Sequence, residues 1–200
     1  GANQWYNPQT TYPVFGDQLM YATSGSQLIY GDDPSDVDGS GPLNGRSDSA
    51  IAMSRDMNVP ISPTAYFRFN HAYGFEYNPT TGDAFDGGVV EYSTNGGSSW
   101  SDLQSLPVEN SYNGVIALLS DPAERNPLAT RMGFVRASNG YISTRIDMSS
   151  LAGETVRFRF RIGSDSTAGY MGWFIDDVMG YTCFDASTLT LRTFLPLARR

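Results

Sequence analysis

The chain has 200 residues, of which 40% are hydrophobic and only 17% charged, so it can bury a core. All 13 basic residues are arginine, and there is one His and one Cys, which excludes lysine catalysis, multi-histidine metal sites and an intrachain disulfide. The formal net charge of −8 argues against nucleic acid as a partner, because phosphate binding needs clustered cations. The longest apolar run, residues 115–119, is far too short to span a membrane.

Residues 1–61 mix aromatic side chains with turn residues and include an acidic, glycine-rich loop at 31–49. We expect them to form an extended N-terminal arm that packs on or between domains, with a short strand at residues 50–54 that opens the sandwich. The composition, rich in Gly, Ser, Thr, Asn, Asp and Tyr, is typical of an extracellular β-protein with many turns. We therefore expect secretion, with any leader already removed.

From residue 62 onward, short segments with alternating hydrophobic and polar residues are separated by turn residues. The clearest is 155–162, where apolar residues occupy every second position and three arginines lie between them. The apolar set is Val156, Phe158, Phe160 and Ile162. A period of two predicts strands with one buried and one solvated face. No stretch of a dozen residues keeps a helical period, so an antiparallel β-sandwich over residues 62–183 is expected.

Two segments carry a resemblance to a known type of module. Residues 85–100 read FDGGVVEYSTNGGSSW, in which Asn95-Gly96 predicts a tight hairpin turn that Trp100 can cover. Residues 158–178 read FRFRIGSDSTAGYMGWFIDDV. Together they resemble the bacterial jelly-roll modules found beside secreted metallopeptidases, and more distantly MAM domains and reelin subrepeats. The resemblance covers roughly residues 62–183 and implies a two-sheet antiparallel jelly roll without its own catalytic centre.

Calcium is the metal to which the residues point, because Asp is a hard oxygen ligand and the chain holds sixteen. Asp176 and Asp177 end a predicted strand, where neighbours face opposite sides unless a bulge intervenes. Glu76 and Asp86, with Asp83, flank a turn that can converge on them. The resemblance implies that Ca²⁺ ties together loops near the chain ends, with Glu76, Asp86 and Asp177 as ligands. The alternative is that Asp176 and Asp177 cap backbone amides.

A second acidic group lies in the loop before residue 50. Its members are Asp32, Asp33, Asp36 and Asp38. The spacing fails the EF-hand template, because Pro34 stands at the first ligand position and Gly45 at the twelfth. Another Ca²⁺ geometry and a solvated loop are both open, and the solvated loop is favoured.

Catalysis has little support in the sequence. His71 lies in an aromatic segment and is interpreted as a hydrogen-bonded core or rim residue, and Cys183 as a buried thiol. No G-x-S-x-G motif occurs, and the spacing of the acids selects no carboxylate pair for glycoside hydrolysis. We therefore expect a protein without enzymatic activity, with a carboxylate-pair hydrolase as the remaining alternative.

Two kinds of binding surface are open. Loop tyrosines can stack on sugars, although core packing is the commoner role of aromatic residues. The candidates are Tyr73, Tyr77, Tyr112, Tyr141 and Tyr170. At the C-terminus, residues 184–200 form a second extended arm whose apolar positions recur at strand spacing. These positions are Leu189, Leu191, Thr193, Leu195 and Leu197.

Such a strand needs a sheet to pair with, either in its own domain or in a neighbouring copy. The expected function is an extracellular structural protein that assembles through its arms into a surface filament or matrix. The alternative is an accessory module of a secreted hydrolase that binds polysaccharide or a cell-surface protein.

Overall fold

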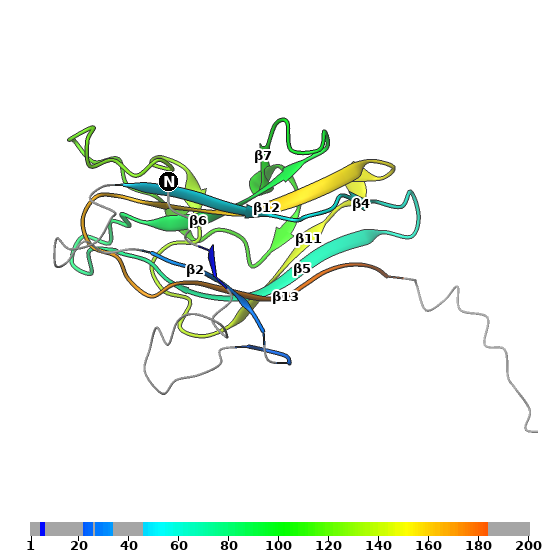
Figure 1. Ribbon diagram of the computed structural model, residues 1–200, viewed down its shortest axis with the longest axis horizontal. Coiled ribbons are helices and arrows are strands. Elements are labelled where there is room, and N and C mark those ends of the chain that lie inside the picture. Colours follow the sequence, from blue (N-terminus) through cyan, green and yellow to red (C-terminus); the bar gives the residue numbers. More distant parts are fainter. Residues whose placement is uncertain (1–4, 7–21, 26, 34–45, 184–200) are drawn as a thin grey trace, which may run out of the picture.

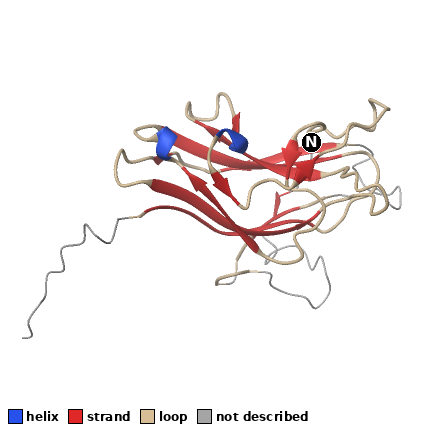
Figure 2. Cartoon of the chain, turned by 180° about the vertical axis from the view of Figure 1, so that it is seen from behind, coloured by secondary structure: helices blue, strands red, loops and turns tan. Residues whose placement is uncertain are grey.

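Two antiparallel β-sheets face each other in the structure, which is a computed structural model describing residues 5–6, 22–25, 27–33 and 46–183 (Figure 1). Sheet A has the strand order β1-β2-β13-β5-β11-β8, and sheet B has the order β3-β12-β6-β7 with β4 paired to β12. The two layers, with loops gathered at both ends, are seen from behind in Figure 2. The prediction of an all-β antiparallel sandwich is confirmed, and its jelly-roll connectivity stays a prediction.

The strands differ widely in length. Those of sheet A are β1 (Trp5–Tyr6), β2 (Ile29–Gly31), β13 (Gly172–Thr182), β5 (Ala65–Gly74), β11 (Ile142–Asp147) and β8 (Val108–Glu109). Those of sheet B are β3 (Ser47–Ala52), β12 (Thr155–Ser164), β6 (Gly87–Ser93), β7 (Ser101–Asp102) and the added β4 (Met57–Asn58). A separate pair joins β9 (Gly114–Val115) to β10 (Met132–Gly133), and short 3-10 helices lie at Leu103–Ser105 and Ser149–Leu151. Residues 122–124 form a hydrogen-bonded turn.

The core forms where the inner faces of β5 and β12 meet. All four apolar residues of the predicted strand are buried, and the rings of Phe67 and Phe158 stack with centroids 4.0 Å apart. Phe69 and Phe160 meet edge to face at 5.0 Å. The alternation of apolar and polar residues in the sequence therefore predicted the buried face of this strand correctly.

The three arginines of β12 lie on the outer face of sheet B and pair with acids. Arg159 and Arg131 bind the carboxylate of Glu91 at 2.5 and 2.7 Å, and Arg161 binds Asp48 at 2.7 Å. These pairs lower the pKa of Asp48, chiefly through its hydrogen bonds to Arg161, and keep Glu91 charged against its burial, with a lowered pKa. The polar face of the predicted strand thus holds an ion-pair network.

The boundary expected at residue 62 is corrected by the strand pairing. β3 pairs with β12 over six residues, and β2 pairs with β13 opposite Trp173–Ile175. Residues 47–52 and 29–31 therefore belong to the sandwich itself, because they pair with its long strands β12 and β13. The expected strand at 50–54 begins three residues earlier than predicted, at Ser47.

In the hairpin after β6, Trp100 covers the turn as predicted, but the residues with positive φ angles differ from those predicted. The positive φ angles fall on Gly96 and Gly97, not on Asn95. Ser93 Oγ accepts the Gly97 N–H at 2.9 Å, which closes the turn one residue later than expected. Trp100 covers it, since a Cβ on Gly97 would lie 3.3 Å from the Trp100 ring.

Candidate metal centre

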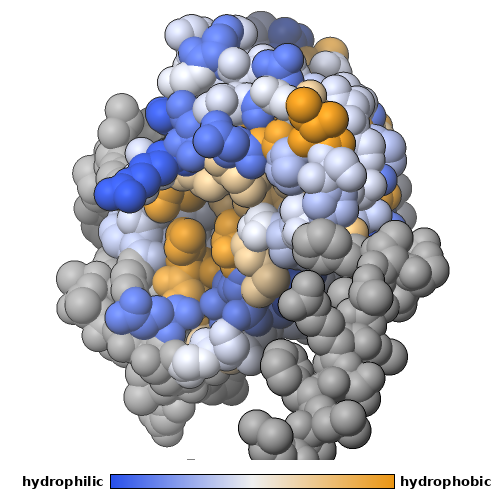
Figure 3. All heavy atoms as spheres, turned by 90° about the vertical axis from the view of Figure 1, so that its right-hand side faces the viewer, coloured by the Kyte–Doolittle hydropathy of each residue, from blue (hydrophilic) through white to orange (hydrophobic). Residues whose placement is uncertain are grey.

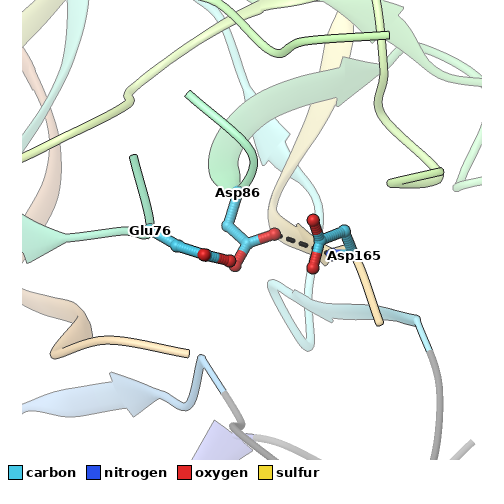
Figure 4. A group of neighbouring side chains, drawn as sticks. All are labelled: Glu76, Asp86 and Asp165. Carbon is cyan, nitrogen blue, oxygen red and sulfur yellow. Dashed lines mark hydrogen bonds between the residues drawn. The ribbon is translucent and has the colours of Figure 1, made fainter. Parts of the chain in front are cut away.

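Three carboxylates from separate segments converge at one end of the sandwich (Figure 4). Glu76 follows β5, Asp86 precedes β6 and Asp165 follows β12. In the pairing of β12 with β6, Gly163 lies opposite Gly87. Asp165, just after β12, therefore lies close to Asp86, just before β6. One oxygen from each carboxylate lies within 4.8 Å of the others.

The loop between β5 and β6 holds Glu76 beside Asp86. The Phe85 N–H donates to the Glu76 carbonyl at 3.0 Å, and a bridge joins Tyr77 to Ala84. Asn78 caps the turn by accepting the Thr80 N–H at 2.8 Å. Asp83, on the far side of this turn, accepts a hydrogen bond from Thr81 and lies outside the group of three.

Asp86 is the most enclosed member and is only partly satisfied. Its side chain is fully buried; Oδ1 accepts the Asp165 N–H at 2.7 Å, and Oδ2 has no hydrogen-bond partner. Buried polar atoms are nearly always paired, and an unpaired carboxylate oxygen is costly. Burial, followed by the negative charge of Asp33, raises the pKa of Asp86 far above the range of an exposed aspartate.

Asp33 is a fourth carboxylate next to this group. It lies two residues after β2, is buried, and accepts hydrogen bonds from Ser164 Oγ at 2.7 Å and the Tyr170 N–H at 3.1 Å. Its negative charge lies close enough to Asp86 to raise the pKa of that carboxyl. Burial is the main cause of its raised pKa.

Thr167 connects the remaining two acids. Its Oγ1 lies 2.8 Å from Asp165 Oδ1 and 3.2 Å from Glu76 Oε2, so its single proton serves one of them at a time. The pKa of Glu76 is raised, mainly by burial and then by the charge of Asp165. The four carboxylates therefore face each other with few donors between them.

This donor set fits a hard divalent cation. Ca²⁺ takes carboxylate and carbonyl oxygens at about 2.3–2.6 Å, so two of its ligands can stand roughly 5 Å apart, as these oxygens do. No sulfur or imidazole lies in the group, which disfavours zinc and copper. A bound cation would also reduce the repulsion between the two to four negative charges around this buried, unpaired oxygen.

The structure joins only part of the predicted ligand set. Glu76 and Asp86 are brought together as expected, whereas Asp176 and Asp177 are not. Asp176 pairs with Asn70 in the sheet, six residues before Glu76, or about 20 Å along the strand. The prediction that these two aspartates share the metal with Glu76 and Asp86 is therefore corrected.

Asp176 and Asp177 instead fasten the segment around residue 23. A bulge follows Asp176, and Asp177 has a φ of 48°, so both side chains reach this segment. Asp176 accepts the Thr23 N–H at 2.6 Å, and Asp177 accepts Thr23 Oγ1 at 2.8 Å and Asn70 Nδ2 at 2.9 Å. Hydrogen bonds from Ser24 and Thr23 lower the pKa of Asp177. The capping alternative therefore holds for Asp176, which accepts the backbone N–H groups of Thr23 and Ser24, whereas Asp177 accepts side-chain donors only.

The second predicted acidic group divides. Asp33 joins the cluster, while Asp32 accepts the Tyr30 hydroxyl at 3.1 Å; Asp36 and Asp38 lie outside the described residues. Asp165 was missed from the sequence, and the available signal was its place directly after the long buried strand β12. The predicted C-terminal arm, with Leu189, Leu191, Thr193, Leu195 and Leu197, also lies outside the described residues.

The tyrosine candidates separate by burial. Tyr73 and Tyr112 are 2% and 8% exposed, so they are core residues and the stacking role predicted for them is wrong. Tyr112 donates its hydroxyl to the Val90 carbonyl at 2.9 Å. Tyr141 is half-buried. Tyr77 and Tyr170 are 38% and 64% exposed, and both adjoin the carboxylate cluster in sequence or by a backbone contact.

His71 is a core residue, as predicted. Its Nδ1 accepts the Trp173 indole N–H at 3.1 Å, so Nε2 carries the proton and donates to Thr144 Oγ1 at 2.8 Å. The Thr144 hydroxyl in turn donates a hydrogen bond to the Asn110 carbonyl. Burial lowers the pKa of His71 to about 3, which keeps it neutral.

Cys183 is exposed, contrary to the buried thiol expected.

No known protein family and no curated protein matches the chain. Among the described residues, no helix is long and apolar enough to cross a membrane.

The pH dependence of stability without metal follows from the cluster. Because the folded protein holds protons on Asp33 and Asp86 that the unfolded chain releases above about pH 4, these groups lose stabilising effect as pH rises toward 7. His71 acts in the opposite sense, since the unfolded chain protonates it below about pH 6.5. In chelator, Asp86→Asn removes the contribution of Asp86 to the first effect and leaves that of His71 unchanged.

We expect the stability advantage of Asp86→Asn over the wild type to grow by roughly 1–3 kcal/mol between pH 4 and pH 7 in chelator. Urea unfolding of both proteins across this range measures it. A constant difference would mean that the carboxyl of Asp86 keeps an ordinary pKa.

Proposed function

We propose that this chain is a non-catalytic, extracellular β-sandwich module whose end loops are fastened by Ca²⁺. The observation that carries the proposal is the buried and unpaired Oδ2 of Asp86 among the carboxyls of Glu76, Asp165 and Asp33. A divalent cation there supplies positive charge to carboxyls that form no ion pair with any arginine among the described residues. It joins the ends of β5, β6, β12 and β2, which are far apart in sequence.

Two observations support a structural role for this site over a catalytic one. Asp86 and Asp165 are buried, so a substrate has little access to the carboxylates. The single histidine is neutral, enclosed and engaged at both ring nitrogens. Binding of polysaccharide or protein stays a prediction, now restricted to the exposed Tyr77 and Tyr170. Assembly through residues 184–200 stays a prediction as well.

Calorimetric titration with Ca²⁺ tests the proposal. The wild type is expected to bind one ion per chain, and Asp86→Asn is expected to lose that heat, because the amide removes a charged ligand from the centre of the group. Asp177→Asn is the matched control, since it also neutralises an aspartate but lies in the Thr23 contact. Binding that survives in Asp86→Asn and disappears in Asp177→Asn would overturn the assignment.

A further inference from the structure

Asparagine is followed directly by glycine at three places in the part of the chain that the structure describes. These pairs are Asn95-Gly96 in the hairpin after β6, Asn113-Gly114 at the start of β9, and Asn139-Gly140 just before β11. The asparagine is exposed in all three. The same dipeptide therefore stands in three surroundings that water reaches, and the pairs differ in what holds the side-chain amide.

The amide of Asn95 is held at both its oxygen and its nitrogen. Its Oδ1 accepts the Ser99 N–H at 2.9 Å and the Ser93 hydroxyl at 2.8 Å, and its Nδ2 donates to Ser99 Oγ at 2.8 Å. This turn lies toward the end of the sandwich that carries β4, where hydrophilic residues predominate along the upper part of the surface (Figure 3). Hydrogen bonding, and not lack of water, therefore restrains this amide.

The amide of Asn113 is held by the backbone of Val135. Its Nδ2 donates to the Val135 carbonyl at 3.0 Å, and its Oδ1 accepts the Val135 N–H at 2.8 Å. Gly114, the next residue, lies opposite Gly133 in the pairing of β9 with β10, and a Cβ on Gly114 would lie 2.7 Å from the Val135 side chain. Both residues of this pair are therefore fixed in place.

Asn139 has none of these restraints. Among the described residues, its side chain makes no hydrogen bond, and the Gly140 N–H has no backbone acceptor. The pair forms a bend between Ser138, which is hydrogen-bonded to Tyr73, and Ile142, the first residue of β11. Gly140 has a φ of 127°, and a Cβ added there would meet nothing within 4 Å, so the backbone has room to turn at this point.

We propose that Asn139 is a site of spontaneous deamidation in the folded protein. The backbone nitrogen of Gly140 loses its proton and attacks Cγ of Asn139, and the new C–N bond closes a cyclic succinimide while Nδ2 takes up a proton and leaves as ammonia. Water then adds to one of the two ring carbonyls and opens the ring to aspartate or isoaspartate. One water is consumed, one ammonia is released, and no electrons are transferred. Glycine favours the attack because it has no Cβ to obstruct it.

The reaction changes the molecule at one defined place. It adds a carboxylate to a chain whose formal net charge is already −8. Isoaspartate also inserts one carbon into the backbone immediately before Tyr141, which packs against the apolar cluster that contains Leu28, Tyr30 and Phe174. This site lies outside the carboxylate cluster, so the proposal is independent of metal binding.

Peptide mass spectrometry on the full chain tests the proposal. The folded protein is incubated at mildly alkaline pH and then cleaved after arginine, which places Asn139 in the peptide 137–145 and the other two asparagines in the peptide 69–125, where fragment spectra separate them. Incubation in concentrated urea gives the reference rates, because unfolding removes the hydrogen bonds at all three pairs. Asn139→Gln is the matched control, since it keeps an amide but has to close a larger ring.

In the folded chain, we expect Asn139 to convert at least about ten times faster than Asn95 or Asn113, because their amides must first break several hydrogen bonds. In urea the three rates should agree within about threefold. Equal rates in the folded chain, or fastest conversion at Asn95 or Asn113, would overturn the proposal. A folded rate at Asn139 more than about ten times below its rate in urea would overturn it as well, because the fold would then restrain this amide too.

Discussion

Calcium at one hundred times its dissociation constant is expected to stabilise the wild type by about 2.7 kcal/mol. For a domain of this size, that corresponds to a rise in melting temperature of about 5–10 °C. The physical reason is that the ion binds the folded cluster, in which four carboxyls stand together, and has no such site in the unfolded chain. Differential scanning calorimetry in Ca²⁺ and in chelator measures the shift.

Asp86→Asn should show almost none of this shift, and in chelator at pH 7 it should melt at a higher temperature than the wild type. Both effects come from removing one buried negative charge. Asp177→Asn should keep the full response to Ca²⁺, because its carboxylate is engaged by Thr23 and Asn70. An equal response in all three proteins would show that calcium acts elsewhere.

Trp173→Ala is expected to lower the free energy of unfolding by about 3–5 kcal/mol, the cost typical of removing a large buried side chain. Trp173 is fully buried and contacts the rings of Phe160, Phe134 and Trp5. It also donates to His71, so its loss leaves Nδ1 without that donor. Few single changes remove so much of a typical domain's stability.

Trp100→Ala is the matched control, because this residue is only half-buried over the Gly97 turn and lies outside the core. Its ring contacts the guanidinium of Arg159 at 4.2 Å, a contact worth about 0.5–1 kcal/mol at an exposed site. Urea unfolding of both variants measures the difference. Equal losses would contradict the placement of Trp173 at the centre of the sandwich.

The buried face of the sandwich could be predicted because it depends on local alternation. Val156, Phe158 and Phe160 follow a period of two, which any antiparallel strand imposes on its side chains. A strand at residues 50–54 was expected to open the sandwich, but the neighbours of β2 and β3 in the sheets could not be predicted. Their place in the sheets depends on pairing with β13 and β12, which are more than a hundred residues away.

The carboxylate cluster could be predicted only in part for the same reason. Glu76 and Asp86 flank one loop, so their proximity follows from the local chain. Asp33 and Asp165 reach the site through the β12–β6 register and the end of β2. Asp177 was misplaced because the resemblance supplied a ligand position without the register of β13 against β5, and Asp176 because the strand expected to end there runs on to Thr182.

The position of a bound ion is the most direct test of the account. A crystal grown with Ca²⁺ and measured for anomalous scattering should show a single strong peak between the carboxylate oxygens of Glu76, Asp86 and Asp165. A peak beside Asp176 and Asp177, or none at the cluster under saturating Ca²⁺, would contradict the proposed metal centre.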